Sequence, residues 1–135
     1  MPERKASLLI VDNEPSIRES LSFGLTEIGY SVRAAEDGFS ALIEIQKETP
    51  DIILSDLNMP GMSGFELLSV VRRRFPALPL IAMSDAFCGD EVSSGVVADA
   101  FYQKGSSLGA LLMIMGALPR TERHPSHLSA ARCQC

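Results

Sequence analysis

Five short strand-like runs, separated by segments of helical length, constrain the fold of this chain most strongly. The first, residues 8–11, is continuously apolar, as expected of a strand buried on both faces of a parallel sheet. Four further strand-like runs, which also contain polar residues, follow at residues 30–34, 51–56, 78–84 and 100–104. This alternation predicts an α/β fold, a doubly wound five-stranded parallel sheet with helices on both faces.

The segments between these runs carry helix signals. Pro15 suits a first helical turn, and apolar residues then recur at helical spacing until Gly29 stops the pattern. A second helix is predicted over residues 37–48. Three of its apolar residues are expected to face the core: Phe39, Leu42 and Ile45. A third helix, from about residue 64 to 75, ends in three arginines that we interpret as a solvated helix end: Arg72, Arg73 and Arg74.

The last two helical segments are unusual. Residues 86–99, "AFCGDEVSSGVVAD", contain two Gly and paired Ser, so a helix there should be short or poorly ordered. The final helix, predicted over residues 107–118, has no charged residue. Its outer side is therefore expected to be covered by a second copy of the domain, a partner protein or the C-terminal tail. In the alternative, its small residues simply form a modestly apolar exposed face.

The size and charge of the chain limit its organisation and partners. The 135 residues fit one domain, predicted over residues 1–118, and the mixed polar segment 119–135 is expected to be a disordered tail. That tail holds three Arg and one Glu, so the first 118 residues carry a net charge of −7, which disfavours nucleic acid. No apolar stretch is long enough to span a bilayer. The three cysteines do not have the spacing of a disulfide framework, which fits a reducing compartment. A cytoplasmic protein without a membrane association is expected.

Polar residues stand where four of the predicted strands end. Asp12, Asn13 and Glu14 follow the first run, and the third, fourth and fifth runs end in three further polar residues: Asp56, Ser84 and Lys104. The carboxyl ends of parallel strands meet at one edge of the sheet, where ligands of such folds bind. Carboxylates gathered there repel one another unless a hard cation such as Mg²⁺ lies between them. With a lysine and a hydroxyl added, the set suits phosphoryl transfer, in which Asp56 could be the nucleophile.

Four segments carry a resemblance to a known family. They are "VDNEPSIRESL", "DIILSDLNMPGMSGFELL", "PLIAMS" and "ADAFYQKG", and together they resemble the receiver domain of two-component response regulators over residues 7 to about 118. The match around Asp56 is specific, because an acid ending an apolar strand, a Met-Pro-Gly turn and a Gly-Phe-Glu-Leu-Leu helix start follow in order. The resemblance implies the flavodoxin-like receiver fold of a stand-alone bacterial phosphorylation switch.

The resemblance also implies roles for individual residues. Asp56 would accept a phosphoryl group from a sensor histidine kinase or phosphotransfer protein. Mg²⁺ would be held by the residues at the family's acidic pair, which are Asp12 and Asn13 here, together with Asp56 and the backbone carbonyl of Asn58. Lys104 and Ser84 would contact the phosphoryl group, and Ser84 and Phe101 would form the switch. Such a domain catalyses at most its own phosphorylation and dephosphorylation, and it would signal through its fourth helix, fifth strand and fifth helix.

Three departures from the family pattern bear on whether the switch works. The family usually has a second acid at Asn13, so the Mg²⁺ ligand set of Asp12, Asn13, Asp56 and Asn58 lacks one charge and should bind the ion more weakly. Asp85 adds a negative charge that should discourage a phosphodonor, and Gly105 replaces a proline, so no cis peptide is expected there. The competing hypothesis is therefore a pseudo-receiver, a phosphorylation-independent interaction or dimerisation module.

Overall fold

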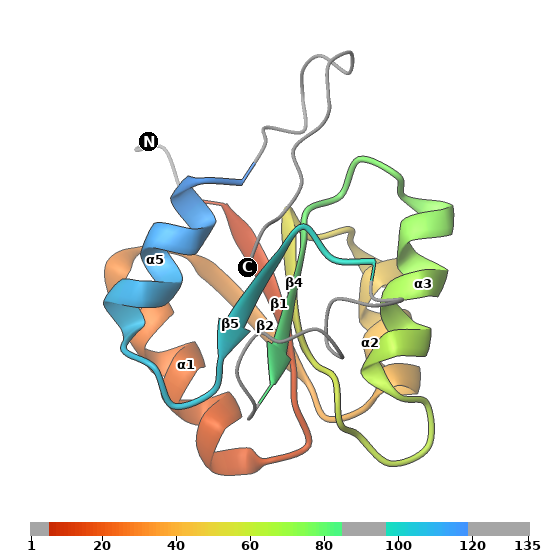
Figure 1. Cartoon of the computed structure of the whole chain (residues 1–135), viewed down its shortest axis with the longest axis horizontal. Helices are drawn as coiled ribbons and strands as arrows, with labels where there is room; N and C mark the ends of the chain where they lie inside the picture. Colours follow the sequence, from red (N-terminus) through yellow and green to blue (C-terminus); the bar gives the residue numbers. More distant parts are fainter. Residues whose placement is uncertain (1–5, 85–96, 119–135) are drawn as a thin grey trace.

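The computed structural model describes residues 6–84 and 97–118 of the chain (Figure 1). Each strand except β4 is followed by a described helix: β1 (Ser7–Val11), α1 (Pro15–Ile28), β2 (Ser31–Ala35), α2 (Gly38–Lys47), β3 (Ile52–Asp56), α3 (Gly64–Arg74), β4 (Leu80–Ser84), β5 (Ala100–Gln103) and α5 (Leu108–Gly116). The helix expected between β4 and β5 and the disordered tail expected after residue 118 lie outside the described residues, and so does Asp85.

The five strands form one parallel sheet in the order β2-β1-β3-β4-β5. The chain leaves β1 toward β2 on one side and reaches β3 on the other, so the strand order reverses between β1 and β3. The carboxyl ends are level, since Val11 pairs with Ser55 and Asp56 pairs with Met83. The predicted doubly wound α/β sheet is confirmed, and its ligand-binding crevice should open at these carboxyl ends.

Helices cover both faces of the sheet, with α1 and α5 on one side and α2 and α3 on the other (Figure 1). Each side has its own core, because alternate residues of a strand point to opposite faces. Along β1, Leu8 and Ile10 join the α1 and α5 side, while Leu9 and Val11 join the α2 and α3 side. All four are fully buried, which explains why the run is continuously apolar.

Local signals in the sequence set the helix ends. Pro15 occupies the first turn of α1, and Gly29 ends this helix in the left-handed conformation with φ 118°. A capping box starts α3, in which Ser63 accepts a hydrogen bond from the Glu66 backbone and Glu66 accepts one from the Ser63 backbone. Ser107 caps α5 in a similar way by accepting from the Ala110 backbone.

One core prediction is wrong and one surface interpretation needs correction. Phe39 was expected to face inward, but it is 61% exposed, because α2 turns Gly38, Ala41 and Ile45 toward the sheet. Arg72 is not merely part of a solvated helix end, since its guanidinium lies 2.8 Å from the carboxylate of Asp99. The same Asp99 carboxylate accepts the backbone N–H of Leu80, so Arg72 joins α3 to the start of β4 and the approach to β5.

The outer side of α5 carries small residues and one large apolar side chain. Leu111 and Met115 are buried against the sheet, and the half-buried Leu112 and Ile114 pack against the same core. Met113 points outward and is 77% exposed. Within the described residues, the uncovered outer side of α5 therefore consists of Met113 and its small neighbours.

Candidate functional site

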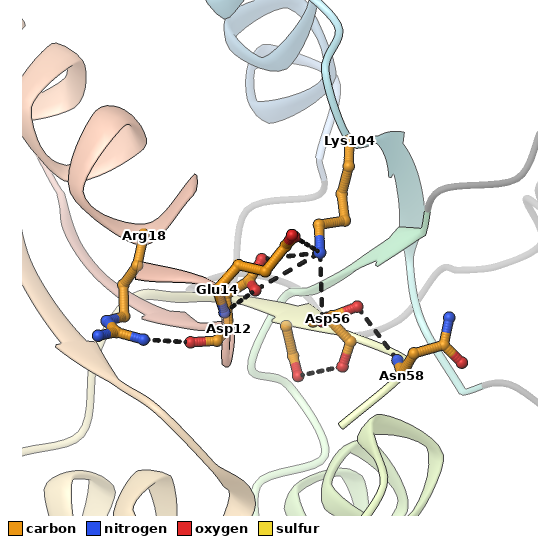
Figure 2. A network of polar contacts seen from close by, with 7 residues as sticks. Asp12, Glu14, Arg18, Asp56, Asn58 and Lys104 are labelled. Carbon is orange, nitrogen blue, oxygen red and sulfur yellow. Dashed lines mark hydrogen bonds and ion pairs between the residues drawn. The ribbon is translucent and has the colours of Figure 1, made fainter. Parts of the chain in front are cut away.

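Three strands deliver charged side chains to one point at the carboxyl edge of the sheet (Figure 2). Asp12 follows β1, Asp56 is the last residue of β3, and Lys104 follows β5. The backbone N–H of Lys104 donates to the carbonyl of Ser84 at 2.9 Å, which continues the pairing of β5 with β4 up to the lysine. Residues separated by as many as 92 positions in sequence therefore meet, as the predicted topology required.

The ammonium of Lys104 is surrounded by three carboxylates. Its Nζ lies 2.9 Å from Glu14 Oε1, 3.2 Å from Asp12 Oδ2 and 3.3 Å from Asp56 Oδ2. The side chains of Lys104 and Asp56 are only 6% and 2% exposed, and that of Asp12 is fully buried. Glu14 is more than half exposed, so it closes the pocket from the solvent side. A buried pair of carboxylates with one compensating ammonium is the electrostatic core of the site.

The backbone holds both buried carboxylates in place. Asp12 Oδ1 accepts the N–H of Glu14 at 2.8 Å, and the Asp12 carbonyl accepts the guanidinium of Arg18 at 2.6 Å. Asp12 does not cap α1: the N-cap residue is Glu14, and its side chain makes no capping hydrogen bond. On β3, Asp56 Oδ1 accepts the N–H of Asn58 at 3.1 Å. Each carboxylate is thus tied to the backbone through Oδ1, while Lys104 Nζ lies near Oδ2 of both and also donates to Asp12 Oδ1 at 3.5 Å.

The surroundings shift the pKa of two of these groups. Burial raises the pKa of Asp56, and the charge of Asp12 adds to this, while the Asn58 N–H and Lys104 partly oppose it. For Lys104, burial acts to lower the pKa, but the hydrogen bond to Glu14 and the charges of Asp56 and Asp12 outweigh it and raise the pKa above its ordinary value. Lys104 therefore stays a cation over the physiological pH range.

The other predicted site residues lie around this centre. Ser84 ends β4 and is half-buried, and Phe101 on β5 is half-buried against the core on the α2 and α3 side. Asn58 and Asn13 are exposed. Asn13 lines an adjoining hollow of about 410 Å³ together with Glu36, Asp37 and the start of the Pro60 turn, and no hydrogen bond joins it to Lys104.

Sequence reasoning missed two features of the site. It assigned no partner to Glu14, whereas Glu14 makes the shortest contact with Lys104. It also gave no structural role to Gly64, where an added Cβ would lie 2.0 Å from the carbonyl oxygen of Asp56 and 2.6 Å from Leu57 Cα. The start of α3 thus presses directly on the backbone of the candidate nucleophile. The only sequence signal for this contact was the glycine itself, within the "GFELL" helix start.

The oxygen atoms of the site suit a magnesium ion only in part. Within residues 6–84 and 97–118 no group of three or more Asp, Glu, His or Cys is arranged as a metal site. However, Asp12 Oδ2 is buried without a hydrogen bond that satisfies it, although Lys104 Nζ is near. Mg²⁺ usually keeps several waters and takes only one or two carboxylates from a protein. Asp12 and Asp56, with a carbonyl oxygen such as that of Asn58, supply that type of donor set.

The parallel sheet reverses its strand order between β1 and β3, and a lysine and two buried carboxylates meet at the strand ends. These features define a class of flavodoxin-like α/β domains with a ligand site at the strand ends. The sequence family described as the response regulator receiver domain matches residues 8–103. The chain belongs to this family, as the sequence motifs predicted.

Known relatives agree with this assignment. The probable transcriptional regulatory protein TcrX of Mycobacterium tuberculosis is 29% identical over 116 residues, covering 84% of this chain. The DNA-binding transcriptional regulator NtrC of Klebsiella pneumoniae is 44% identical over 75 residues, or 56% of this chain. The chain spans only half the length of TcrX and 16% of the length of the DNA-binding NtrC.

Solved structures give the same result. The chemotaxis protein CheY4 of Vibrio cholerae superposes with a TM-score of 0.80 at 33% identity, covering 84% of this chain and 98% of CheY4. The response regulator TrrA of Thermotoga maritima, in complex with Mg²⁺ and BeF, gives a TM-score of 0.74 at 30% identity, with 83% and 97% covered. None of the helices in the described part of this chain is long and apolar enough to cross a bilayer.

Proposed function

We propose that the chain is a phosphoacceptor switch of a two-component phosphorelay, in which Asp56 accepts a phosphoryl group from a sensor histidine kinase or a phosphotransfer protein. The observation that carries the proposal is the placement of the buried Asp56 carboxylate 3.3 Å from Lys104 and beside the second buried acid, Asp12. Family membership supports a role in two-component signalling. A location in the bacterial cytoplasm stays a prediction from sequence.

The reaction follows from the groups at the edge of the sheet. An oxygen of the ionised Asp56 carboxylate would attack the phosphorus of a phosphohistidine, the P–N bond would break, and the imidazole would leave with the electron pair. Lys104 would pair with a phosphoryl oxygen and compensate its charge, and Ser84 would donate a hydrogen bond to it. Mg²⁺, held by Asp12, Asp56 and the Asn58 carbonyl, would supply further charge neutralisation when bound.

The proposed switch passes from Asp56 to the β5 and α5 side. Ser84 and Lys104 lie on adjacent strand ends, joined by the Lys104 N–H to Ser84 carbonyl bond, so a phosphoryl group that draws both would bias their strands together. Phe101, three residues before Lys104, is the aromatic group we propose to respond. A kinase and a downstream protein are the expected partners, and no nucleic acid is proposed for this domain.

A specific observation keeps the pseudo-receiver as a second candidate. Asn13 replaces an acid, and Lys104 is already held by three carboxylates, with the closest contact to Glu14. Lys104 would have to give up part of these contacts to reach a phosphoryl oxygen, which would disfavour a phosphodonor. In that case the domain would serve as a phosphorylation-independent interaction or dimerisation module.

Incubation with acetyl phosphate and Mg²⁺ should add one phosphoryl group to the wild-type protein, observed as intact mass. Asp56→Ala should remove this gain completely, because the accepting oxygen is gone. Glu36→Ala, which removes an exposed acid near the same opening, is the matched control and should still be phosphorylated. Failure of the wild type to gain mass at any Mg²⁺ concentration would contradict the phosphoacceptor switch and favour the pseudo-receiver.

Restoring the missing acid should strengthen the metal site. Asn13→Asp is expected to tighten Mg²⁺ binding roughly tenfold, about 1.4 kcal/mol, because a third carboxylate would then attract the ion. The chain contains no Trp, so calorimetry or NMR is the suitable measurement. Asn58→Ala is the control, since only the backbone carbonyl of Asn58 is proposed as a ligand. An unchanged affinity in Asn13→Asp would show that residue 13 is not a ligand position.

A further inference from the structure

A second apolar surface lies between α2 and α3, and it shares Phe39 and Gly61 with the hollow beside Asn13. It is a groove of about 640 Å³, and the following residues line it: Phe39, Gly61, Met62, Phe65, Glu66, Ser69, Val70 and Arg73. Phe39 is 61% exposed and Phe65 is 38% exposed. We call this surface the α3 groove. Two phenylalanines left in solvent on neighbouring helices form a patch that association would cover.

Two charges of opposite sign lie at equal distances on either side of the centre of the α3 groove. Glu66 stands near the start of α3 and Arg73 near its end, and both are exposed. They are seven residues apart, which places them on one helix face about 10.5 Å apart along the axis. The midpoint between them falls between Ser69 and Val70, a small and a medium-sized residue. Neither Arg73 nor Arg74 has an ion-pair partner within the described residues, unlike Arg72.

We propose that the α3 groove is a dimerisation surface whose occupant is a second copy of this chain, packed with the two α3 helices antiparallel about a two-fold axis at Ser69 and Val70. In this arrangement Glu66 of each copy faces Arg73 of the other, so the interface contains two identical ion pairs. A two-fold interface must be self-complementary in this way. The proposal goes beyond the phosphoacceptor function and does not depend on it.

Other properties of α3 favour the same arrangement. Antiparallel packing places the positive start of each helix dipole beside the negative end of the other. It also places Phe65 of one copy opposite Arg74 of the other, a pairing of an aromatic ring with a guanidinium. Ser69 and Val70 at the axis are small enough for close helix approach. Phe39 and Met62 then flank the contact and bury apolar surface at its edge.

Sedimentation velocity between about 10 µM and 1 mM would test the proposal. The interface is modest in size, so we expect a reversible dimer with a dissociation constant of about 0.1 mM. Glu66→Arg and Arg73→Glu should each give a monomer, because each places like charges in contact twice. The double variant should dimerise again. Most diagnostic, an equimolar mixture of the two single variants should form a heterodimer in which both ion pairs are restored.

Controls separate this surface from others and from misfolding. Met113→Lys on the outer side of α5 should leave the dimer intact. Because Glu66→Arg also removes the capping contact with the Ser63 N–H, circular dichroism should verify the fold, and Glu66→Gln, which keeps an acceptor, should weaken the dimer less. NMR of the wild type on dilution should shift the Ser69 and Val70 amides. A wild type that is monomeric at 1 mM, single variants that still dimerise, or a mixture that stays monomeric would overturn the proposal.

Discussion

Replacing Gly64 by alanine should lower the free energy of unfolding by about 3 kcal/mol, near the upper end of the cost of overpacking. The added Cβ would meet the carbonyl oxygen of Asp56 at 2.0 Å and Leu57 Cα at 2.6 Å. Both are backbone atoms at the end of a central strand, so neither can rotate away as a side chain could. Either α3 or the end of β3 has to shift. Urea denaturation followed by circular dichroism measures the loss.

Gly109→Ala is the matched control for that substitution. Gly109 also lies in the first turn of a helix, but its added Cβ would meet only Ser107 Oγ at 3.8 Å, an ordinary contact. That variant should be neutral or more stable by up to about 1 kcal/mol, as expected for alanine in a helix. Equal stabilities for the two variants would contradict the close packing of α3 on Asp56. Any Gly64→Ala protein that folds should also accept a phosphoryl group more slowly.

Lys104→Met should lower the free energy of unfolding by about 3 kcal/mol at neutral pH. Methionine keeps much of the volume of lysine, but it removes the charge that compensates Asp12 and Asp56 in a site where all three side chains are buried. Two like charges would then remain close together without a counter-charge. Thermal and urea unfolding at several pH values would measure both the size and the pH dependence of the loss.

The pH dependence has a definite sign. Burial already raises the pKa of Asp56 in the folded state, and the loss of Lys104 would raise it further. Protonation of this carboxyl therefore favours the folded state. The destabilisation by Lys104→Met should be smallest below the unfolded-state pKa of about 4 and should grow as the pH rises through the folded-state pKa. A loss that does not depend on pH would contradict this origin.

An exposed lysine provides the control for Lys104→Met. Lys47 pairs with Glu44 at 3.3 Å on the surface of α2, where such pairs contribute less than about 1 kcal/mol. Lys47→Met should therefore change stability little, and its effect should vanish at high salt. If the two lysine variants were equally destabilised, the ion pairs of Lys104 would have no special weight in this fold.

The sequence contained enough to predict the sheet and the centre of the site, because both depend on local patterns. A strand that is buried on both faces of the sheet has a continuous apolar sequence. Because ligand sites of such sheets lie at the carboxyl ends of the strands, Asp12, Asp56 and Lys104 were predicted to lie together. Side-chain orientation was harder to predict. Phe39 and Ile45 both fit a helical period, but α2 buries the face that carries Gly38, where an added Cβ would lie 2.7 Å from Met62 Sδ, and leaves Phe39 outside.

Contacts that depend on three-dimensional approach could not be read from spacing. Glu14 turns toward Lys104 because the ammonium emerges from β5, 90 residues later in the chain. Arg72 finds its partner in Asp99, 27 residues away, across the ends of two strands. The requirement for glycine at residue 64 follows from how closely α3 lies against β3. In each case the sequence shows one participant, and only the fold identifies the other.

The position of Lys104 directly after the edge strand β5 has a consequence for how the protein is made. As the chain emerges from the ribosome, the strands that carry Asp12 and Asp56 are synthesised first, and their cation arrives only with β5. A nascent chain that ends before residue 104 would have to bury two uncompensated carboxylates to close its sheet. The acidic pair should therefore delay completion of the native core until the last strand has been translated.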